Sequence, residues 1–426
     1  MEVYGKILLI AMPAFLLLVL FEKWYGWKFR HDRPQNMDTI SSLSSGVTNV
    51  TKDVLGLSIN IIAYGWLVSQ IALVHIEASW MVYVIAFLCI DFAGYWIHRW
   101  SHSVNVFWNL HIIHHSSERY DLACALRQSI SMFVNPFTFL LIPAALLGVP
   151  EKVIATVGPL HLFAQFWYHT VYINRMGFLE KIIVTPSHHR VHHALNKEYI
   201  DKNLSQIFIF WDKLFGTFQA EMKDVPPVYG ITRPVRTWNP IKINFQHLWL
   251  MMKDAWRTNN WKDRAFLWFR QTGYRPADVA EKYPVYKIDD PYQFEKYAPR
   301  SSSALVSWSW FQLVMILAVI SYLFGQISYI NGLNPYFIYW YGGFIFLSIY
   351  AITELMDRNP YAMYWEGLRV LLGSWFLYSQ GDWFGASVYF SSVKYLVAAY
   401  FIVSLFITGI FVMKHRKEDQ LARVNA

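Results

Sequence analysis

Histidines concentrate in two short stretches of this chain. Of its 15 histidines, nine lie within residues 98–115 and 188–193. They form the runs His98-Arg-Trp-Ser-His102, His111-Ile-Ile-His114-His115 and His188-His189-Arg-Val-His192-His193. Neutral imidazole is a borderline-soft nitrogen ligand that suits iron, zinc, copper and nickel. The residue type and its density therefore indicate metal binding.

The spacing of these histidines fits helices that present several imidazoles on one face. His98 and His102 are four residues apart, and the later runs repeat spacings of three and four, which bring side chains together on a helix. One such pair alone is more often an ordinary feature of a helix. Three runs would place several ionisable rings side by side, which is costly in a buried site unless they bind metal. Eight imidazoles are about twice what one tetrahedral ion accepts, so the sequence predicts two metal ions.

The three runs, in this order beside apolar segments, resemble the fatty acid hydroxylase and sterol desaturase superfamily of membrane di-iron oxygenases. The stretches 109–128, 185–193, 200–203 and 211–217 are most similar to its alkylglycerol monooxygenase branch. The similar region runs from about residue 80 to 220. The resemblance implies an enzyme: a non-haem di-iron monooxygenase that uses O2 to hydroxylate a C–H bond of a lipid.

The resemblance also implies which histidines bind the two iron ions. Some members of the superfamily bring another histidine pair from the region where Gln165 and His169 stand here, so His169 is a candidate ninth ligand, with His161 as a further candidate. His188 precedes the motif triplet, and we expect it to hydrogen-bond a ligand or to contact a headgroup. The eight predicted ligands are His98, His102, His111, His114, His115, His189, His192 and His193.

Polar residues near the motifs are candidates to hydrogen-bond and orient these ligands. Asp91 lies seven residues before His98, hence on the same helix face, in an apolar segment where a carboxylate needs a partner. It would fix the tautomer of a ligand imidazole, or else pair with Arg99 or another polar group. Similarity to family positions adds further candidates with the same role: Gln165, Asn203 and Asp212, and also Glu118, Asp121 and Asp201.

One position departs from the family pattern and bears on the electron donor. In alkylglycerol monooxygenases an acidic residue directly follows the second histidine of the first motif and is linked to activity with tetrahydrobiopterin. Ser103 stands at that position here. Two donors are therefore considered, a reduced pterin and a cytochrome b5-like or ferredoxin-like protein that docks on a basic cytoplasmic face. Zinc could replace iron in the purified protein, but it has no redox states and would not activate O2.

Composition places the chain among multi-pass membrane proteins. Hydrophobic residues make up 55% of the chain and charged residues 15%, against about 25% charged in soluble domains. The net charge of +8 is spread among apolar segments without a DNA- or RNA-binding motif, so we expect no nucleic-acid partner. The sequence contains no phosphate-binding loop, dinucleotide fingerprint, HExxH or GxSxG pattern, which excludes the usual signatures of nucleotide-dependent and hydrolytic enzymes.

Apolar segments predict an all-α, polytopic bundle of about nine transmembrane helices. Lys and Arg are enriched in the connections assigned to the inside and in the tail after residue 413. This bias puts the C-terminus and the histidine clusters, carried by a helical cap, in the cytoplasm. The host membrane would be a cell inner membrane or the endoplasmic reticulum. The predicted spans fall near 7–21, 54–75, 80–98, 130–149, 153–173, 304–324, 336–353, 364–380 and 393–413.

Four regions follow from this layout. Residues 1–79 form an N-terminal transmembrane region, 80–220 the catalytic region, 221–303 a cytoplasmic or interfacial segment, and 304–426 a C-terminal transmembrane region. Within 241–256, apolar residues recur at helical spacing among Lys and Arg. This pattern predicts an amphipathic helix that either lies in the headgroup plane or packs on protein.

A membrane location favours a lipid substrate that enters from the bilayer: an alkylglycerol ether lipid, a fatty acyl chain or a sterol-like molecule. A desaturase on the same scaffold is an alternative, because desaturation and hydroxylation need the same oxidant. A metal transporter is an alternative from another class. Transport sites lie near the bilayer midplane, however, whereas these histidines follow the end of a predicted span.

Overall fold

The computed structural model describes residues 2–33 and 35–424, and this part of the chain is mostly helical. The one sheet within it has two short parallel strands, β1 (Ile59–Asn60) and β2 (Val134–Asn135). Ile59 pairs with Val134 and Asn60 with Asn135. The predicted helical fold class is confirmed.

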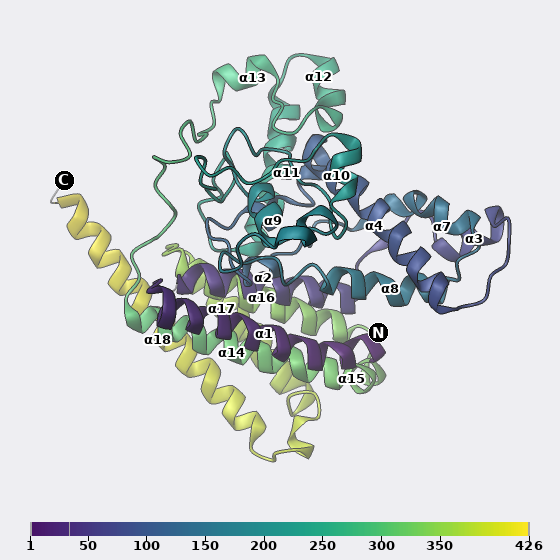
Figure 1. Cartoon of the computed structure of the whole chain (residues 1–426). Coiled ribbons are helices and arrows are strands. Elements are labelled where there is room, and N and C mark those ends of the chain that lie inside the picture. The colour runs from purple at the N-terminus through teal and green to yellow at the C-terminus, as the bar shows by residue number, and fades with distance from the viewer. Residues whose placement is uncertain (1, 34, 425–426) are drawn as a thin grey trace. The chain divides into compact units, whose positions relative to one another are not determined.

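The chain divides into two compact units, each described by itself. The first comprises Met1–Leu57, Arg236–Lys242 and Tyr297–Ala426, and the second comprises Ser58–Val235 and Ile243–Lys296. The long helices of the first unit are α1 (Glu2–Arg30), α2 (Asn36–Val54), α14 (Ser303–Gly325), α16 (Phe337–Met356), α17 (Ala362–Gln380) and α18 (Val393–Val424), with the short α15 (Ile327–Leu333). Within this unit α1, α14 and α16 run side by side (Figure 1).

The second unit has one long helix and many short ones. The long helix is α4 (Trp80–Ser103). The others are α3 (Tyr64–Ile71), α5 (Asn105–Trp108), α6 (Ile112–His115), α7 (Ile142–Leu146), α8 (Glu151–Phe163), α9 (Pro186–His192), α10 (Phe210–Phe215), α12 (Trp261–Phe266) and α13 (Ala277–Lys282). Helix α11 (Pro240–Arg257) begins in the Arg236–Lys242 segment and continues through residue 257.

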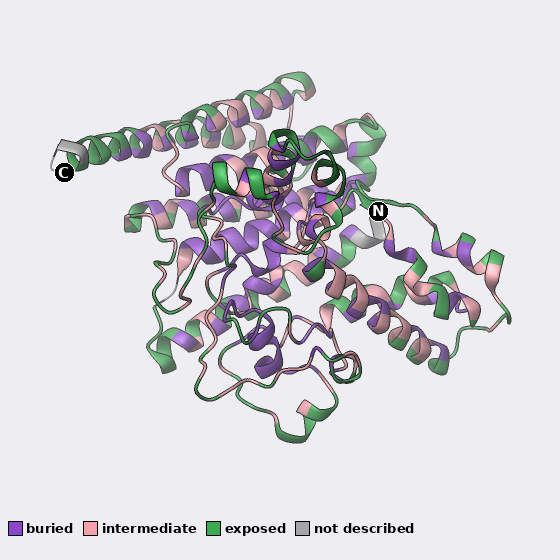
Figure 2. Ribbon diagram, turned by 90° about the horizontal axis from the view of Figure 1, so that it is seen from above, coloured by how far each residue is buried: buried purple, intermediate pink, exposed green. Residues whose placement is uncertain are grey.

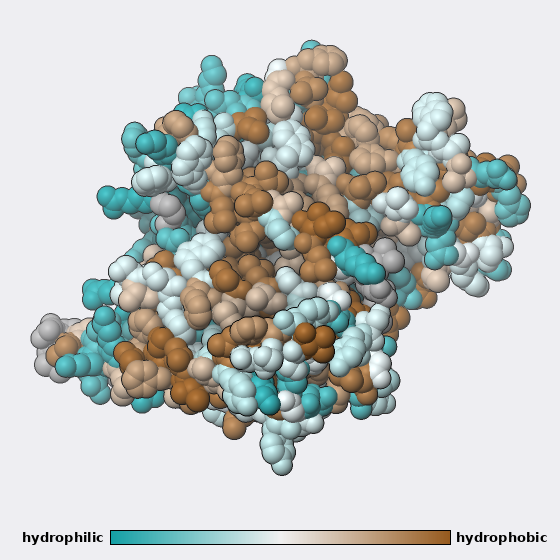
Figure 3. Space-filling view, turned by 90° about the horizontal axis from the view of Figure 1, so that it is seen from below, coloured by the Kyte–Doolittle hydropathy of each residue, from teal (hydrophilic) through white to brown (hydrophobic). Residues whose placement is uncertain are grey.

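Five helices of the described chain are long and apolar enough to cross a membrane. Large apolar side chains are exposed along them, such as Leu17 in α1 and Phe406 in α18, and Figure 3 shows broad apolar areas on the surface. Apolar surface of this extent is expected where helices face lipid. The C-terminal end of α18, in contrast, is exposed and charged (Figure 2). These spans are Gly5–Arg30, Trp80–Ser103, Ser303–Gly325, Phe337–Met356 and Val393–Ala422.

The predicted count of nine spans is not confirmed. The segment 54–75 contains the end of α2, strand β1 and the short α3, and 130–149 contains β2, a 3-10 helix (Phe137–Leu141) and α7. In 153–173 helix α8 already ends at Phe163. Proline and glycine interrupt the segment 130–149 at Pro136, Pro143 and Gly148, which explains why the apolar run there does not form one long helix. Helix α17 is long enough, but its polar and charged residues lower its hydropathy.

Helix α2 has no counterpart among the predicted spans, although it is almost entirely buried. Its buried face is rich in serine and threonine, and it packs against α14 and α16. Thr48 and Thr51 donate their hydroxyl hydrogens to the carbonyls of Ser45 and Val47, both at 2.7 Å. Small hydroxyl side chains let helices approach closely and satisfy their polar groups within the helix. A hydropathy pattern therefore misses this helix.

A buried ion pair links α17 and α18 in the first unit. The Arg369 guanidinium donates to both carboxylate oxygens of Glu366, at 2.5 and 3.0 Å, and also to Ser404 Oγ and Tyr400 Oη. Arg369 and Glu366 are nearly inaccessible to solvent. Each charge is therefore stabilised mainly by the other and by the surrounding hydroxyls.

Removing one partner of this ion pair should lower the free energy of unfolding more than removing both partners. We expect Arg369→Met alone to lower the free energy of unfolding by about 3–5 kcal/mol, because Glu366 is left buried and uncompensated. The double variant Glu366→Gln/Arg369→Met should recover part of that loss. Thermal unfolding of the full chain in detergent measures both variants. Equal losses in the single and double variants would contradict the ion pair as described.

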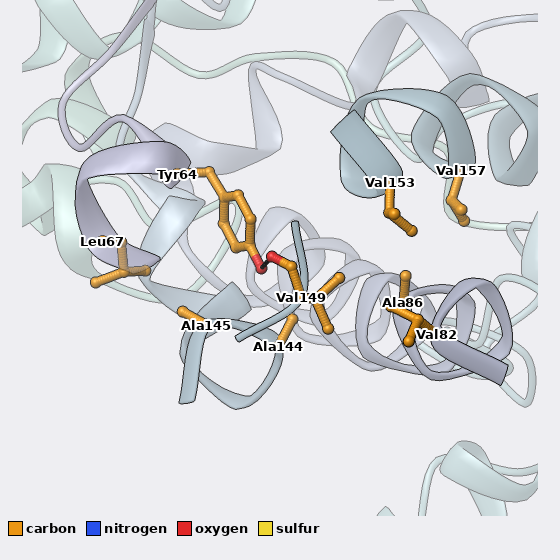
Figure 4. Packing of buried hydrophobic residues seen from close by; sticks show 9 residues of the cluster. All are labelled: Tyr64, Leu67, Val82, Ala86, Ala144, Ala145, Val149, Val153 and Val157. Carbon is orange, nitrogen blue, oxygen red and sulfur yellow. Dashed lines mark hydrogen bonds between the residues drawn. The ribbon is translucent and has the colours of Figure 1, made fainter. Parts of the chain in front are cut away.

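A small apolar core in the second unit fixes the position of α4 (Figure 4). Val82 and Ala86 of α4 pack with Val153 and Val157 of α8, and Tyr64 of α3 donates its hydroxyl hydrogen to the carbonyl of Val149 at 3.0 Å. Farther along α4, a β-carbon at Gly94 would lie 2.0 Å from Gln206 Oε1. Glycine there leaves room for the Gln206 side chain beside α4. This packing positions the C-terminal end of α4, which carries the first histidines.

The predicted amphipathic helix near 241–256 is confirmed as α11. Ile243, His247 and Met251 are buried, whereas Trp249 and Trp256 are 58% and 87% exposed. The chain after α11 returns to α4: Gln271 forms an antiparallel bridge with Val104, directly after the last residue of α4. The segment 267–273 therefore lies at the end of a candidate span.

Candidate metal centre

The second unit brings nine histidines into two adjacent groups. Within each group, one ligand nitrogen from every residue lies within 4.8 Å of the others. All of these side chains are buried except that of His111, which is half-buried. The first group is His98, His102, His111, His115 and His192, and the second is His114, His169, His189 and His193.

The second and third histidine runs are each divided between the two groups. His98 and His102 lie one turn apart near the end of α4 and share the first group. His114 and His115 are neighbours in α6 and enter different groups, because consecutive side chains point about 100° apart on a helix. His192 and His193, at the end of α9, divide in the same way. Each of the neighbouring pairs His114/His115 and His192/His193 therefore supplies one imidazole to each group.

Backbone carbonyls orient the rings from outside. Nδ1 of His98 lies 2.7 Å from the carbonyl oxygen of Leu204, and Nδ1 of His192 lies 3.0 Å from that of Lys202. A carbonyl only accepts hydrogen bonds, so Nδ1 carries the hydrogen and Nε2 keeps its lone pair. Outer hydrogen bonds of this kind are typical of metal-binding histidines.

The second group shows the same arrangement most clearly. His169 Nδ1 contacts the carbonyl oxygen of Gln165 at 3.0 Å, and His114 Nδ1 contacts that of Arg127 at 3.3 Å. Their Nε2 atoms then face each other at 3.3 Å. Two inward lone pairs at this distance repel unless a cation lies between or beside them.

Unpaired nitrogens in the first group also indicate a bound cation. Nε2 of His102, of His115 and of His192 is buried and has no hydrogen-bond partner among the described residues. An unsatisfied buried acceptor is costly, and a bound metal ion would satisfy it. The donor set of both groups therefore fits a metal ion.

Burial favours the neutral, metal-binding form of several of these imidazoles. Burial, followed by repulsion from neighbouring imidazoles, lowers the pKa of His111, His115 and His193 well below the ordinary value of 6.5. Neutral rings leave their lone pairs available near pH 7. Electrostatics and hydrogen bonding thus favour the same protonation state.

Acidic residues near the groups act mainly through the backbone. Asp201 accepts a hydrogen bond from His102 Nδ1 at 3.2 Å, a direct contact to the first group. Asp212 instead accepts from the amides of Leu204 and Ser205, at 2.7 and 2.9 Å. It therefore fixes the peptide whose carbonyl orients His98. Asn203 donates to the His188 carbonyl at 3.0 Å and adopts a left-handed backbone with φ of 52°.

Asp91, which we expected to orient a ligand, lies against other partners. It accepts from His161 Nε2 at 2.8 Å, from Trp211 Nε1 at 2.9 Å and from the amide of Ile207 at 3.0 Å. His161 belongs to neither group. Asp91 therefore ties α4 to α8 and to the 207–211 segment.

The side chains of Gln165 and His188 form no described hydrogen bond with either group. The Gln165 side chain donates to His161 Nδ1 at 3.2 Å, while its carbonyl holds His169. The His188 ring accepts from the amide of Thr185 as part of a helix capping box. Ser103, which stands where the family pattern has an acidic residue, donates its hydroxyl hydrogen to the carbonyl of Arg99 at 2.8 Å.

Sequence reasoning missed the carbonyl groups that orient the rings. The carbonyls of Gln165, Arg127, Lys202 and Leu204 perform this role, and a carbonyl is present in every residue type. Only the proximity of residues 202–204 to the last histidine run hinted at their role. The structure therefore adds a second layer that composition and spacing do not encode.

Comparison with known proteins identifies similar chains. The fatty acid hydroxylase family model matches residues 83–217. Alkylglycerol monooxygenase of Homo sapiens is 39% identical over 63% of this chain and 60% of its own length, and that of Xenopus tropicalis is 32% identical over 82% and 77%. A Delta(7)-sterol 5(6)-desaturase of Aspergillus fumigatus is 26% identical over 34% and 42%. No solved structure matches the chain.

If each group binds one ion, removing His169 should affect the metal content of the chain. We expect His169→Ala to lower the metal content of the purified chain from about two ions towards about one, because the second group loses one of four ligands. The matched control is His161→Ala, which removes an imidazole from outside both groups. Elemental analysis of chains purified without oxygen measures the content. A loss in the control as large as in His169→Ala would contradict this assignment.

Proposed function

Because this chain belongs to the fatty acid hydroxylase family, in its alkylglycerol monooxygenase branch, we propose that it is a membrane di-iron monooxygenase that hydroxylates a C–H bond of a lipid. Its relatives support an oxidoreductase that acts on lipids. The metal, the substrate and the reaction type are parts of the proposal.

The observation that carries the proposal is the pair of buried histidine groups. Nine clustered imidazoles offer more nitrogen ligands than one ion accepts. The ligands we propose are the eight motif histidines and His169. When bound, two iron ions would supply the redox chemistry that lets O2 attack an unactivated C–H bond.

The proposed reaction balances as a monooxygenation. One oxygen atom of O2 enters the C–H bond as a hydroxyl group, and the other leaves as water. A donor supplies two electrons, and two protons are taken up. A reduced pterin or a cytochrome b5-like or ferredoxin-like protein is the proposed donor. The chain's own residues hold the ligand rings neutral and fixed, and they shield the site from water by burial.

Membrane topology supports a lipid substrate. The first group begins in the last two turns of α4, a candidate span, so a lipid in the bilayer would reach it without crossing water. We propose that the histidine groups and the C-terminus face the cytoplasm, on the evidence of the charge bias of the connecting segments. An alkylglycerol ether lipid is the substrate that the names of the relatives favour.

A desaturase is the second candidate, and the similarity to a sterol desaturase favours it. Hydroxylation and desaturation begin with attack on a C–H bond and differ in whether oxygen is inserted or a second hydrogen is lost. Substrate position would decide between them. The two products differ in mass, because hydroxylation adds an oxygen atom and desaturation removes two hydrogens.

Activity should depend on the histidine groups and not on histidine content in general. We expect His102→Ala to lower the rate of oxidation of an alkylglycerol at least about a hundredfold, as expected for loss of a required metal ligand. His188→Ala, the matched control, should stay within a few-fold of the unaltered chain. Mass spectrometry of the lipid after incubation with iron, O2 and a reductant measures the product. Full activity of His102→Ala would contradict the proposal.

A further inference from the structure

A cavity of about 290 Å³ adjoins the first histidine group within the second unit. His102, His115 and His192 form one wall, and Arg233, Arg275 and Lys287 contribute cationic side chains elsewhere in the lining. This volume is near the lower end of the roughly 300–1,000 Å³ of small-molecule sites. The cavity can therefore hold a polar head or a small molecule, but not a whole lipid with its chain.

Arg233 carries the charge that makes this cavity chemically specific. Its guanidinium donates to His247 Nδ1 at 3.2 Å. His247 Nε2 in turn lies 2.9 Å from the carbonyl oxygen of Asn105, so Nε2 carries the hydrogen and Nδ1 accepts from Arg233. Burial and the neighbouring Arg233 lower the pKa of His247 to about 4. Arg233 therefore contacts a neutral partner.

The other charges in the lining are already matched. Arg275 forms a bidentate pair with Asp254, at 2.6 and 2.9 Å. The one carboxylate in the lining, that of Asp201, contacts His102. Among residues 2–33 and 35–424, no carboxylate forms an ion pair with Arg233. Asp254 attracts the half-buried Arg233 electrostatically, but its hydrogen bonds go to Arg275. An oxyanion in the cavity would give the Arg233 guanidinium a counter-charge in direct contact through charge-assisted hydrogen bonds.

Further polar groups in the lining suit the same kind of ligand. The buried hydroxyl of Thr272 has no hydrogen-bond partner in the described part of the chain. Gly273 has a φ of 81° and leaves open space where a side chain would stand. Lys287 is exposed and adds a positive charge to the lining. These features favour a compact, negatively charged oxygen group.

The position of the cavity relates it to the membrane. Gln271, Thr272 and Gly273 line it, and the amide of Thr272 donates to the carbonyl of Ser103, the last residue of the candidate span α4, at 3.3 Å. The cavity thus begins at the end of a candidate span, where a lipid headgroup would be within reach. Free phosphate or another small oxyanion offers the same chemistry from the aqueous side.

We propose that this cavity binds the phosphate headgroup of a single-chain lipid, with Arg233 as the main contact, and so holds that lipid beside the first histidine group. Neither the family resemblance nor the proposed reaction assigns a phosphate-binding site. The identification of this ligand as a substrate rests on the proposed function, whereas the binding itself does not.

Direct binding tests the proposal without turnover. Isothermal titration calorimetry in an uncharged detergent compares dodecyl phosphate, inorganic phosphate and uncharged 1-O-dodecylglycerol on the full chain. We expect Arg233→Gln to weaken dodecyl phosphate binding at least about tenfold, the lower bound for loss of a charge-assisted hydrogen bond, and to leave dodecylglycerol unchanged. Arg233→Lys should retain part of the affinity. The matched control is Arg270→Gln, an exposed arginine outside the lining.

Each outcome decides the proposal. Dodecyl phosphate that binds more tightly than inorganic phosphate supports a lipid headgroup as the ligand, whereas equal binding shows that the cavity recognises phosphate alone and overturns the lipid assignment. Unchanged dodecyl phosphate affinity in Arg233→Gln overturns the proposal. If Arg233→Gln does not fold, Lys287→Gln provides the test. We expect it to weaken dodecyl phosphate binding about two- to fivefold at low salt, and an unchanged affinity would overturn the proposal. Absence of lipid oxidation would refute the proposed function but would not affect the conclusion about binding in the cavity.

Discussion

Convergence of imidazole lone pairs is the constraint on which the second unit depends. Hydrogen bonds to backbone carbonyls hold the outer nitrogens of His98, His114, His169 and His192, so the inner nitrogens face one another without hydrogens between them. Such an arrangement is unfavourable by itself. It becomes stable when a cation binds, and the free energy of metal binding then contributes to folding.

The surrounding structure supports this convergence from two directions. The apolar packing of α3, α4, α7 and α8 fixes the helix that carries His98 and His102. Asp212 and Asp91 then hold the 204–211 segment through buried hydrogen bonds to its backbone. Neither carboxylate touches an imidazole of the two groups through a described hydrogen bond. Their contribution is to place the carbonyl of Leu204 where His98 needs it.

Sequence reasoning predicted the ligand candidates better than their surroundings. The eight motif histidines and His169 all lie in the two groups, because histidine has few other reasons to occur at such density. Asp91 was expected beside a ligand, but helical spacing gives only the face of a helix and not the partner across it, which is His161. The carbonyls that orient the rings, and the unmatched Arg233, carry no sequence signal at all. Long apolar helices were likewise predictable, whereas the segments 54–75 and 130–149 are divided by turns and short elements.

X-ray absorption spectroscopy at the iron edge, on the full chain purified and loaded with iron without oxygen, tests the central claim most directly. The account predicts iron coordinated mainly by imidazole nitrogens, with the multiple-scattering pattern of several histidine rings per ion. Iron coordinated chiefly by water or carboxylate oxygens, with no imidazole pattern, would contradict it.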